Sequence, residues 1–199
     1  MNPYRTAGLV TAAGASSRMG SPKALLKLPD GSPLAAHQLR RLVKAGCDPV
    51  TLVLGSEAER IQNALPTDLP TVINQQWETG RFSSIQTGLR ALWPFDACVI
   101  LPVDAVGLSD RSIDQLIEYA NQSKSSAVRP TYQGKPGHLL WIDQSIGQRL
   151  LEYEGAMDQS LQDWLRDETD LCEINDPQLT ANVNTPEQWR QWFSALSQQ

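Results

Sequence analysis

The 199-residue sequence predicts an α/β protein in which a mostly parallel β-sheet is covered by helices on both faces. Short apolar runs rich in β-branched residues alternate with amphipathic segments, a pattern typical of parallel strands joined by helices. Hydrophobic residues make up 41% of the chain, enough for one full core. No linker rich in proline, glycine and serine divides the chain, so we expect a single domain over residues 1–199.

Buried strands are predicted where the chain is apolar and β-branched. In chain order these are residues 7–12, 50–54, 71–73, 97–101, 127–129, 139–142 and 171–174. Ligands of a parallel sheet bind beyond the carboxyl ends of its strands. The loops after the first and the fourth predicted strand are therefore expected to reach the same crevice.

Helices are predicted between these strands and at the end of the chain. The first begins with Ser32 as N-cap and proline at the first helical position, and Gly46 is placed to end it. Further helices are expected over residues 57–64 and 84–92, after Ser109, and from Pro186 onward. The last helix carries Trp189, Trp192, Phe193 and Leu196, a stripe that we interpret as packing and not as a stacking platform for a base.

Composition excludes several classes of partner. The net charge of −5 and the pI near 5.0 argue against binding to nucleic acid or to an anionic membrane, because both need clustered Lys and Arg. A small-molecule partner is expected instead. No apolar run approaches the roughly 20 residues of a membrane span, and no signal pattern opens the chain, which favours the cytoplasm. Cys47, Cys98 and Cys172 form no C-x-x-C pair and are expected to be free thiols.

The first predicted strand runs directly into a loop of small residues that carries Arg18 and Lys23. Small side chains let backbone N–H groups approach phosphate oxygens, and Gly14 and Gly20 can adopt positive φ. The spacing is not that of a Walker loop, because five residues separate the two glycines and Lys23 follows after two more. The G-x-G-x-x-G fingerprint is also absent. The loop predicts a site for nucleotide phosphates, the alternative being a surface turn with two solvated cations.

Two polar positions could face this loop. Asp104 directly follows the apolar run 99–103 and is the first candidate for holding Mg²⁺, which takes one or two carboxylates together with phosphate oxygens and waters. A helix cap or a solvated loop acid is the alternative. The segment Asn182-Val183-Asn184-Thr185-Pro186 could also turn into the crevice, although a turn followed by a helix cap explains it equally well.

Two further segments contain glycine beside polar side chains. Gly80, Ser83 and Ser84 precede a predicted helix, where hydroxyls can bind a base or ribose but by default cap the helix. The turn at residues 134–138 ends in His138, which could act as a base but is more readily explained as a polar contact. His37, inside the first helix, is expected to be structural. No Ser–His–Asp or Cys–His spacing is present, which disfavours a covalent intermediate.

Together these motifs resemble those of the MobA-like nucleotidyltransferases, specifically the molybdenum cofactor cytidylyltransferase branch. The resemblance covers nearly the whole chain. It rests on Ala12-Ala13-Gly14-x-Ser16-x-Arg18-Met19-Gly20-x-x-Lys23, on Asn74, Trp77, Gly80, Ser83 and Ser84, on Asp104, on Gly134 with Gly137-His138, and on Asn184-Thr185-Pro186-Glu187. It implies a three-layer Rossmann-like sandwich of the nucleotide-diphospho-sugar transferase type.

The resemblance also implies a reaction in which the phosphate of an acceptor, molybdopterin in the closest relatives, attacks the α-phosphate of an NTP and expels pyrophosphate. The doublet Ala13-Gly14 points to CTP, where Gly-Gly would point to GTP. A molybdoenzyme or its chaperone is a possible further partner. The implied roles are phosphate neutralisation by Arg18 and Lys23, Mg²⁺ binding by Asp104 and Asn184, nucleotide binding by Ala12, Ala13, Gly14, Ser16, Gly20, Gly80, Ser83 and Ser84, and acceptor binding by Gly137 and His138.

Several positions depart from the family pattern. Asn182 and Asn184 stand where the family usually has aspartates, and an amide brings no negative charge to a metal. Where the family has Asp-x-Pro, this chain has Asp104-Ala105-Val106, and where the family has Gly-His-Pro, it has Gly137-His138-Leu139. The family's Gly-Asp-x-Gly-Ala-Arg is reduced to a shorter stretch at residues 154–157. Two alternatives therefore stay open: the same chemistry on a sugar or polyol phosphate, and a nucleotide-binding accessory protein with weakened catalysis.

Overall fold

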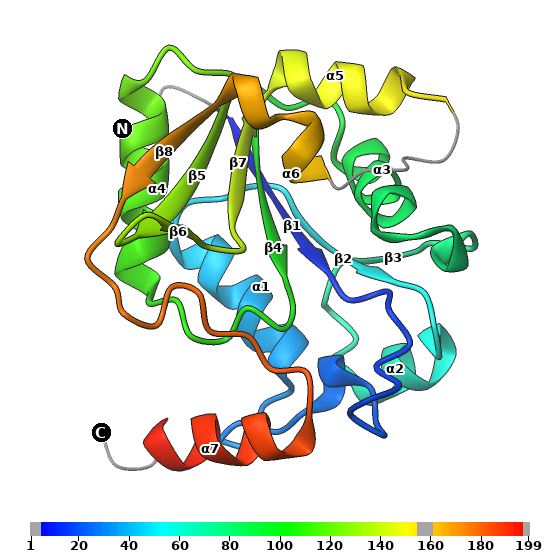
Figure 1. The fold of residues 1–199 in the computed structure, drawn as a ribbon. Coiled ribbons are helices and arrows are strands. Elements are labelled where there is room, and N and C mark those ends of the chain that lie inside the picture. Colours follow the sequence, from blue (N-terminus) through cyan, green and yellow to red (C-terminus); the bar gives the residue numbers. More distant parts are fainter. Residues whose placement is uncertain (1–4, 155–160, 197–199) are drawn as a thin grey trace.

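A computed structural model describes residues 5–154 and 161–196, which form an α/β fold around one mixed sheet (Figure 1). The strands are β1 Thr6–Thr11, β2 Val50–Leu54, β3 Thr71–Ile73, β4 Ala97–Pro102, β5 Ala127–Tyr132, β6 Lys135–Pro136, β7 Leu140–Asp143 and β8 Thr169–Glu173. They are arranged in the order β3-β2-β1-β4-β7-β5-β6, with β8 paired to β5. The strands β3, β2, β1 and β4 are mutually parallel, whereas β7 runs antiparallel to β4 and β5. The predicted fold class is confirmed.

Helices cover both faces of this sheet. They are α1 Leu34–Lys44, α2 Ala58–Ala64, α3 Arg81–Leu92, α4 Asp110–Gln122, α5 Gln144–Glu152, α6 Leu161–Trp164 and α7 Pro186–Leu196, with 3₁₀ turns η1 Lys23–Leu25, η2 Trp77–Thr79 and η3 Arg166–Glu168. Successive residues of β1 point to opposite faces. Val10 therefore packs with Leu39 of α1, and Leu9 packs with Leu89 of α3. Figure 1 shows α1 and α4 on one side of the sheet and α3 and α5 on the other.

Most predicted elements are observed, and the helix starts are the main corrections. Helix α1 begins at Leu34 with Pro33 as N-cap and no capping side chain, so the predicted cap at Ser32 is wrong. The Ser32 carbonyl instead accepts from Leu28 N at 3.0 Å and keeps Ser32 in the preceding turn. The predicted end of α1 is confirmed, because Gly46 has φ +85° just after the last turn. The cap at Ser109 is also confirmed.

Helix α3 begins at Arg81, three residues before the predicted start at residue 84. Ser83 and Ser84 therefore lie inside its first turn and are not caps. The predicted set of elements also lacked the two-residue strand β6 and the helices α5 and α6, of which α6 is a single turn.

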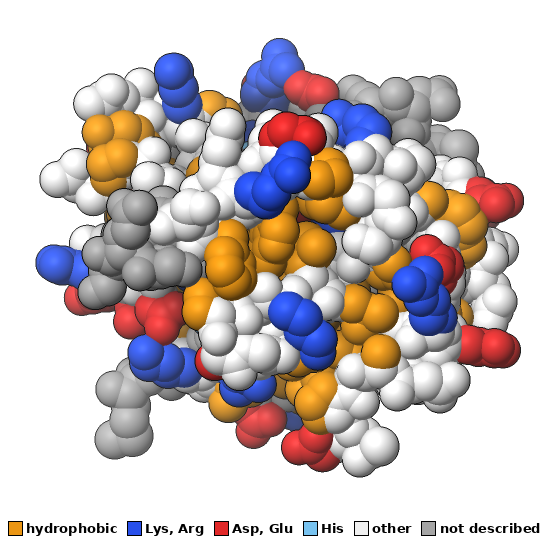
Figure 2. Space-filling view, turned by 90° about the horizontal axis from the view of Figure 1, so that it is seen from below, with side chains coloured by type: hydrophobic (Ala, Val, Ile, Leu, Met, Phe, Trp, Pro, Cys, Tyr) orange, Lys and Arg blue, Asp and Glu red, His pale blue; other side chains and the backbone are white. Residues whose placement is uncertain are grey.

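The remaining expectations concern packing. Trp189 and Trp192 of α7 are partly buried against the core, which confirms the packing interpretation of that stripe. The three cysteines are free and buried, and burial raises the pKa of the Cys47 thiol to about 12. Among the described residues, no helix is long and apolar enough to cross a membrane. Seen from the α7 side, Lys and Arg side chains are scattered among acidic and uncharged ones (Figure 2).

Candidate functional site

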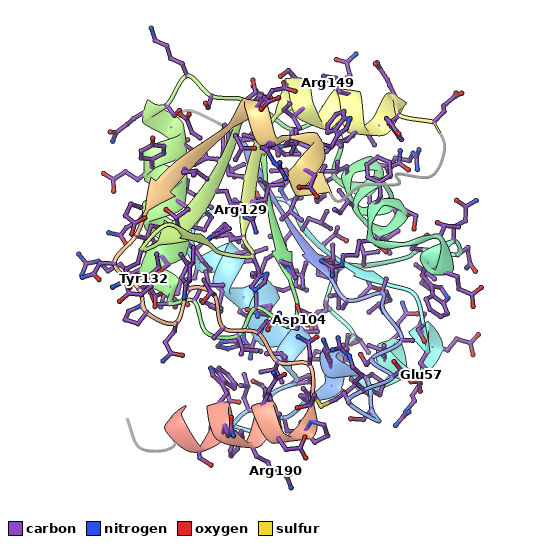
Figure 3. All side chains as sticks on the ribbon, viewed as in Figure 1. Glu57, Asp104, Arg129, Tyr132, Arg149 and Arg190 are labelled. Carbon is purple, nitrogen blue, oxygen red and sulfur yellow. The ribbon has the colours of Figure 1, made fainter. Side chains whose placement is uncertain are left out.

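A cluster of one carboxylate, one amide and two cations lies at the carboxyl ends of β1 and β4. Lys23 Nζ donates to Asp104 Oδ2 and to Asn184 Oδ1, both at 2.7 Å. Figure 3 shows Asp104 beyond the end of β4, between the sheet and α7. Residues from three distant parts of the chain therefore meet at one point: the loop after β1, the loop after β4 and the segment before α7.

The cluster is half-open to solvent and has an excess of positive charge. The side chains of Lys23 and Asp104 are 13% and 26% exposed. Arg18 Nη2 approaches Asn184 Oδ1 at 3.5 Å from the exposed side of the loop. Two cations thus share one carboxylate and one neutral amide, and this balance favours binding of an anion such as a phosphate.

The loop over residues 12–22 places Lys23 by means of an unusual backbone. Ser16 adopts a left-handed conformation with φ +51°, and Gly20 does so with φ +72°. Ser16 Oγ accepts from Lys23 N at 3.2 Å, so the strained serine also fixes the start of η1. Ala12 and Ala13 are buried, whereas Gly14 and Arg18 are exposed. The predicted loop residues therefore form an open bend that ends at the lysine.

Ser83 and Ser84 bind to Asn74, the residue that follows β3. Asn74 is 3% exposed, and its Nδ2 donates to Ser83 Oγ at 2.8 Å and to Ser84 Oγ at 3.0 Å. Asn74 Oδ1 accepts from Gln76 N at 2.9 Å. Gly80, with φ +116°, completes the turn between η2 and α3. These contacts fix the chain between β3 and α3 beside the carboxyl ends of the strands.

Ala13 borders a tightly packed wall formed by the loop after β2. Ser56 N donates to Ala13 O at 2.9 Å. A Cβ at Gly55 would lie 2.6 Å from Trp77 Cβ and 2.7 Å from Ala13 O, so only glycine fits there. The sequence analysis did not single out Gly55, although a glycine directly after the predicted strand 50–54 could have signalled a close backbone approach.

Gly137 and His138 precede β7 and contact the segment before α7. His138 Nε2 lies 3.2 Å from Thr180 O, and Gly137 O accepts from Arg129 Nε at 2.8 Å. His37 lies in α1, where burial lowers the pKa of its imidazole. Asn182 lines a separate cavity of about 280 Å³ beside Trp192. Of the two asparagines in the late motif, Asn184 is thus the one bonded to Lys23.

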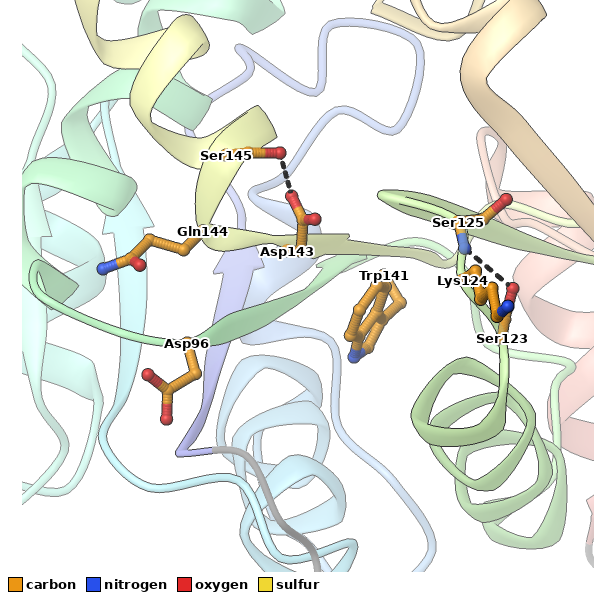
Figure 4. A pocket seen from close by; sticks show the side chains of 8 residues that line it. All are labelled: Asp96, Ser123, Lys124, Ser125, Trp141, Asp143, Gln144 and Ser145. Atoms are coloured by element: carbon orange, nitrogen blue, oxygen red, sulfur yellow. Dashed lines mark hydrogen bonds between the residues drawn. The ribbon is translucent and has the colours of Figure 1, made fainter.

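A larger hollow of about 680 Å³ lies at the opposite end of the sheet (Figure 4). Asp96, before β4, and Asp143, at the end of β7, form part of its wall together with Lys124. Asp143 Oδ1 accepts from Ser145 Oγ at 2.7 Å and caps α5. None of the predicted site residues lines this hollow, and the stretch 155–157 named among the departures lies outside the described residues.

The cluster at Lys23 fits a hard divalent cation. No group of three or more His, Cys, Asp and Glu side chains able to hold a metal occurs in residues 5–154 and 161–196. Asp104 and Asn184 nevertheless aim two oxygen atoms at one point, where the Lys23 ammonium now sits. Magnesium typically takes one or two protein oxygens and completes its shell with phosphate oxygens and water. The donor set therefore suits a metal that arrives with a phosphate ligand.

The side chains that hold these segments in place were not predicted from the sequence. Gln38 and Arg41 of α1 are buried against the loop that carries Asp104. Asp176 Oδ2 accepts from Ser109 N at 2.9 Å on the other side of that loop. The sequence did contain a signal for such a role, namely a glutamine and an arginine on the apolar face of the predicted first helix.

A sheet edge with a cationic small-residue loop after one strand and a carboxylate after its neighbour defines an α/β protein built to bind nucleotide phosphates. Comparison with known families makes the class more specific. The sequence pattern of the MobA-like NTP transferase domain matches residues 8–172. The chain belongs to this family and is a nucleotidyltransferase of the MobA type, so the resemblance inferred from the sequence motifs is confirmed at the family level.

Individual relatives carry different names. A probable molybdenum cofactor guanylyltransferase of Rhodopirellula baltica is 35% identical over 124 residues, which span 61% of this chain and 57% of that protein. The nicotine blue oxidoreductase of Paenarthrobacter nicotinovorans is 28% identical over 193 residues, 91% of this chain and 93% of that protein. The crystal structure of an Rv0371c homologue from Mycobacterium sp. strain JC1 has a TM-score of 0.79 at 22% identity, with 98% of each chain covered.

Proposed function

We propose that the protein transfers CMP, in preference to GMP, from a nucleoside triphosphate to the phosphate of a molybdopterin-type acceptor and releases pyrophosphate, with Mg²⁺ as cofactor. The observation that carries the proposal is the position of Lys23. Its ammonium closes the phosphate loop and is held at 2.7 Å by both Asp104 Oδ2 and Asn184 Oδ1. These contacts support a cation-binding point directly beside the proposed phosphate-binding loop.

The chain's residues serve mainly to position and neutralise. Exposed N–H groups of the loop and the side chains of Arg18 and Lys23 would bind the triphosphate. An acceptor phosphate is already anionic near neutral pH, so its attack on the α-phosphate needs no general base. A bound divalent ion supplies positive charge to the phosphate oxygens, and Asp104 and Asn184 are the residues that would hold it. His138, which lies against Thr180 O, is not required as a base.

Lys23 has to move when a metal binds to the same two oxygen atoms. The ammonium fully balances the single negative charge of Asp104, since Asn184 is neutral. A triphosphate offers Lys23 new acceptor oxygens and at the same time brings ligands for the metal. Nucleotide and metal are therefore expected to bind together, and metal alone to bind poorly.

The base and the acceptor rest on separate observations. Ala13 is buried, and its methyl group faces Gly55, where an added Cβ would lie 2.8 Å from Ala13 Cβ. The base proposal is carried by the doublet Ala13-Gly14 and its sequence resemblance. This resemblance supports cytosine, even though the relative from Rhodopirellula baltica is named a guanylyltransferase. The acceptor proposal is supported by that relative's name and by the sequence resemblance.

The proposal is tested by measuring pyrophosphate release. The protein is incubated with Mg²⁺, CTP or GTP, and molybdopterin, and in parallel with a panel of sugar and polyol phosphates. Release that requires molybdopterin and is faster with CTP is expected. Tight CTP binding without release from any acceptor would support the accessory protein instead, and release with a sugar phosphate alone would refute the molybdopterin acceptor.

A further inference from the structure

The loop after β4 is held by two side chains of α1. Gln38 is fully buried, and its Nε2 donates to the carbonyl oxygens of Val103 and Ala105, both at 3.2 Å. These residues lie immediately before and after Asp104. One buried amide group therefore binds the carbonyl oxygens of both residues that flank Asp104.

Arg41 holds Gln38 in this position. Its Nη1 donates to Gln38 Oε1 at 2.9 Å, which leaves the amide nitrogen of Gln38 directed at the loop. Arg41 is itself 6% exposed, with Nε bonded to Asp110 Oδ1 at 2.8 Å and Nη2 bonded to Leu108 O. Together the two side chains bind three carbonyl oxygens of the stretch between β4 and α4 and the carboxylate of the first residue of α4.

The same loop is bonded to the segment before α7 on its other side. Asp104 O accepts from Val183 N at 3.0 Å, one residue before Asn184. The backbone of Asp104 is thus fixed from α1 and simultaneously linked to the residue beside Asn184. The backbone segments that carry Asp104 and Asn184 are consequently held together by hydrogen bonds, while the two side chains remain partly exposed.

We propose that Gln38, oriented by Arg41, is a positioning residue for the cation site, which keeps Asp104 directed at the same point as Asn184. The inference rests on the proposed function, because it assigns the site to a metal bound with nucleotide. An apolar side chain on this buried face of α1 would leave two carbonyl oxygens without their donors. Buried groups that orient a metal ligand typically contribute about 10- to 100-fold to metal affinity or activity.

The chain offers a matched control in Gln86 of α3. Gln86 is also buried, and its Nε2 also donates to two carbonyl oxygens, those of Leu150 at 2.8 Å and Tyr153 at 2.9 Å. These bonds hold α5 on the opposite face of the sheet. Gln38→Met and Gln86→Met therefore remove the same chemistry from two places, of which one borders Asp104.

The test compares CTP binding with and without metal by titration calorimetry. The readout is the factor by which Mn²⁺ tightens CTP binding relative to binding in the presence of EDTA. This factor is expected to fall about tenfold in Gln38→Met and to stay at the wild-type value in Gln86→Met. Metal-free CTP affinity is expected to be the same in all three proteins. Urea unfolding reports the stability that each variant loses.

The outcomes distinguish a failure of this inference from a failure of the proposed function. If Mn²⁺ tightens CTP binding equally in the wild type and in Gln38→Met, the positioning role is wrong and the proposed metal site stands. If Mn²⁺ tightens binding of neither CTP nor GTP in the wild type, the proposed function fails and the inference fails with it. If Gln38→Met does not fold, the same measurement is made on Arg41→Lys. This variant retains a cation near Asp110 but loses the guanidinium group that orients Gln38. An unchanged metal effect in folded Arg41→Lys overturns the inference.

Discussion

The two loops that meet at Lys23 are built in opposite ways. The loop over residues 12–22 exposes Gly14 and Arg18 and bends through a left-handed serine. The loop over residues 103–109 is mostly buried, and its carbonyl oxygens are bound by Gln38 and Arg41. One loop leaves its backbone open to a ligand, whereas the other fixes a carboxylate before any ligand arrives. The loop that carries Arg18 and Lys23 and the loop that carries Asp104 therefore have separate structural supports.

The largest effect is expected from Lys23→Met, which removes the side chain that joins the loop over residues 12–22 to Asp104 and Asn184. It should lower kcat/KM for pyrophosphate release by about a hundredfold to a thousandfold, because a positioned cation is lost from the transferring phosphate. Lys27→Met, an exposed lysine four residues further on, serves as the control and should retain full activity. A near-normal rate in folded Lys23→Met would remove Lys23 from the mechanism.

Asn184→Asp changes the fixed side of the site. A second carboxylate opposite Asp104 should tighten Mn²⁺ binding in the absence of nucleotide by about tenfold, since it leaves a negative charge that Lys23 alone does not balance. Asn182→Asp adds the same charge but lines the separate cavity, and it should leave Mn²⁺ binding at the wild-type level. Equal effects of the two changes, measured by electron paramagnetic resonance of Mn²⁺, would contradict the assignment of Asn184.

The open loop is probed at its start by Ala13→Gly. Removing the methyl group should shift the ratio of kcat/KM for CTP over GTP toward GTP by about tenfold, the size of effect that a single methyl group has on discrimination in a pocket. The free energy of unfolding should fall by about 1 kcal/mol, because a buried methyl group is lost. A ratio that stays constant would show that Ala13 does not set the base preference.

The smallest effect is expected from Ser16→Ala. This change removes the hydrogen bond from Lys23 N to Ser16 Oγ, which contributes on the order of 1 kcal/mol. The KM for CTP should therefore rise several-fold while kcat is retained. Ser17→Ala, at the neighbouring exposed position, is the control. If both variants behave like the wild type, the bend at Ser16 does not position Lys23.

Sequence patterns predicted the sheet and the meeting of the loops because both follow from burial and strand direction. The strands at residues 50–54 and 71–73 were predicted with the observed bounds, since they are short, β-branched runs between polar segments. Asp104 could be placed opposite the loop after β1 because parallel neighbours end at the same edge.

The supports of the site could not be predicted in the same way. A single Gln38 on the apolar face of a helix does not reveal that its partners are carbonyl oxygens 65 and 67 residues away. Asn182 and Asn184 belong to one motif, but the backbone conformation places Asn184 against Lys23, whereas Asn182 lines a cavity. Gly80 and the serines after it were interpreted as a helix cap. Gly80 is indeed the N-cap of α3, whereas Ser83 and Ser84 lie inside the helix and their hydroxyls bind Asn74.

The most direct test of the central claim is a crystal structure of the protein with CTP and Mn²⁺, in which the metal is located by its anomalous scattering. A metal peak is expected between Asp104 Oδ2 and Asn184 Oδ1, with Lys23 moved from these oxygen atoms to the phosphates. A metal bound elsewhere, with Lys23 still bonded to Asp104 and Asn184, would contradict that claim.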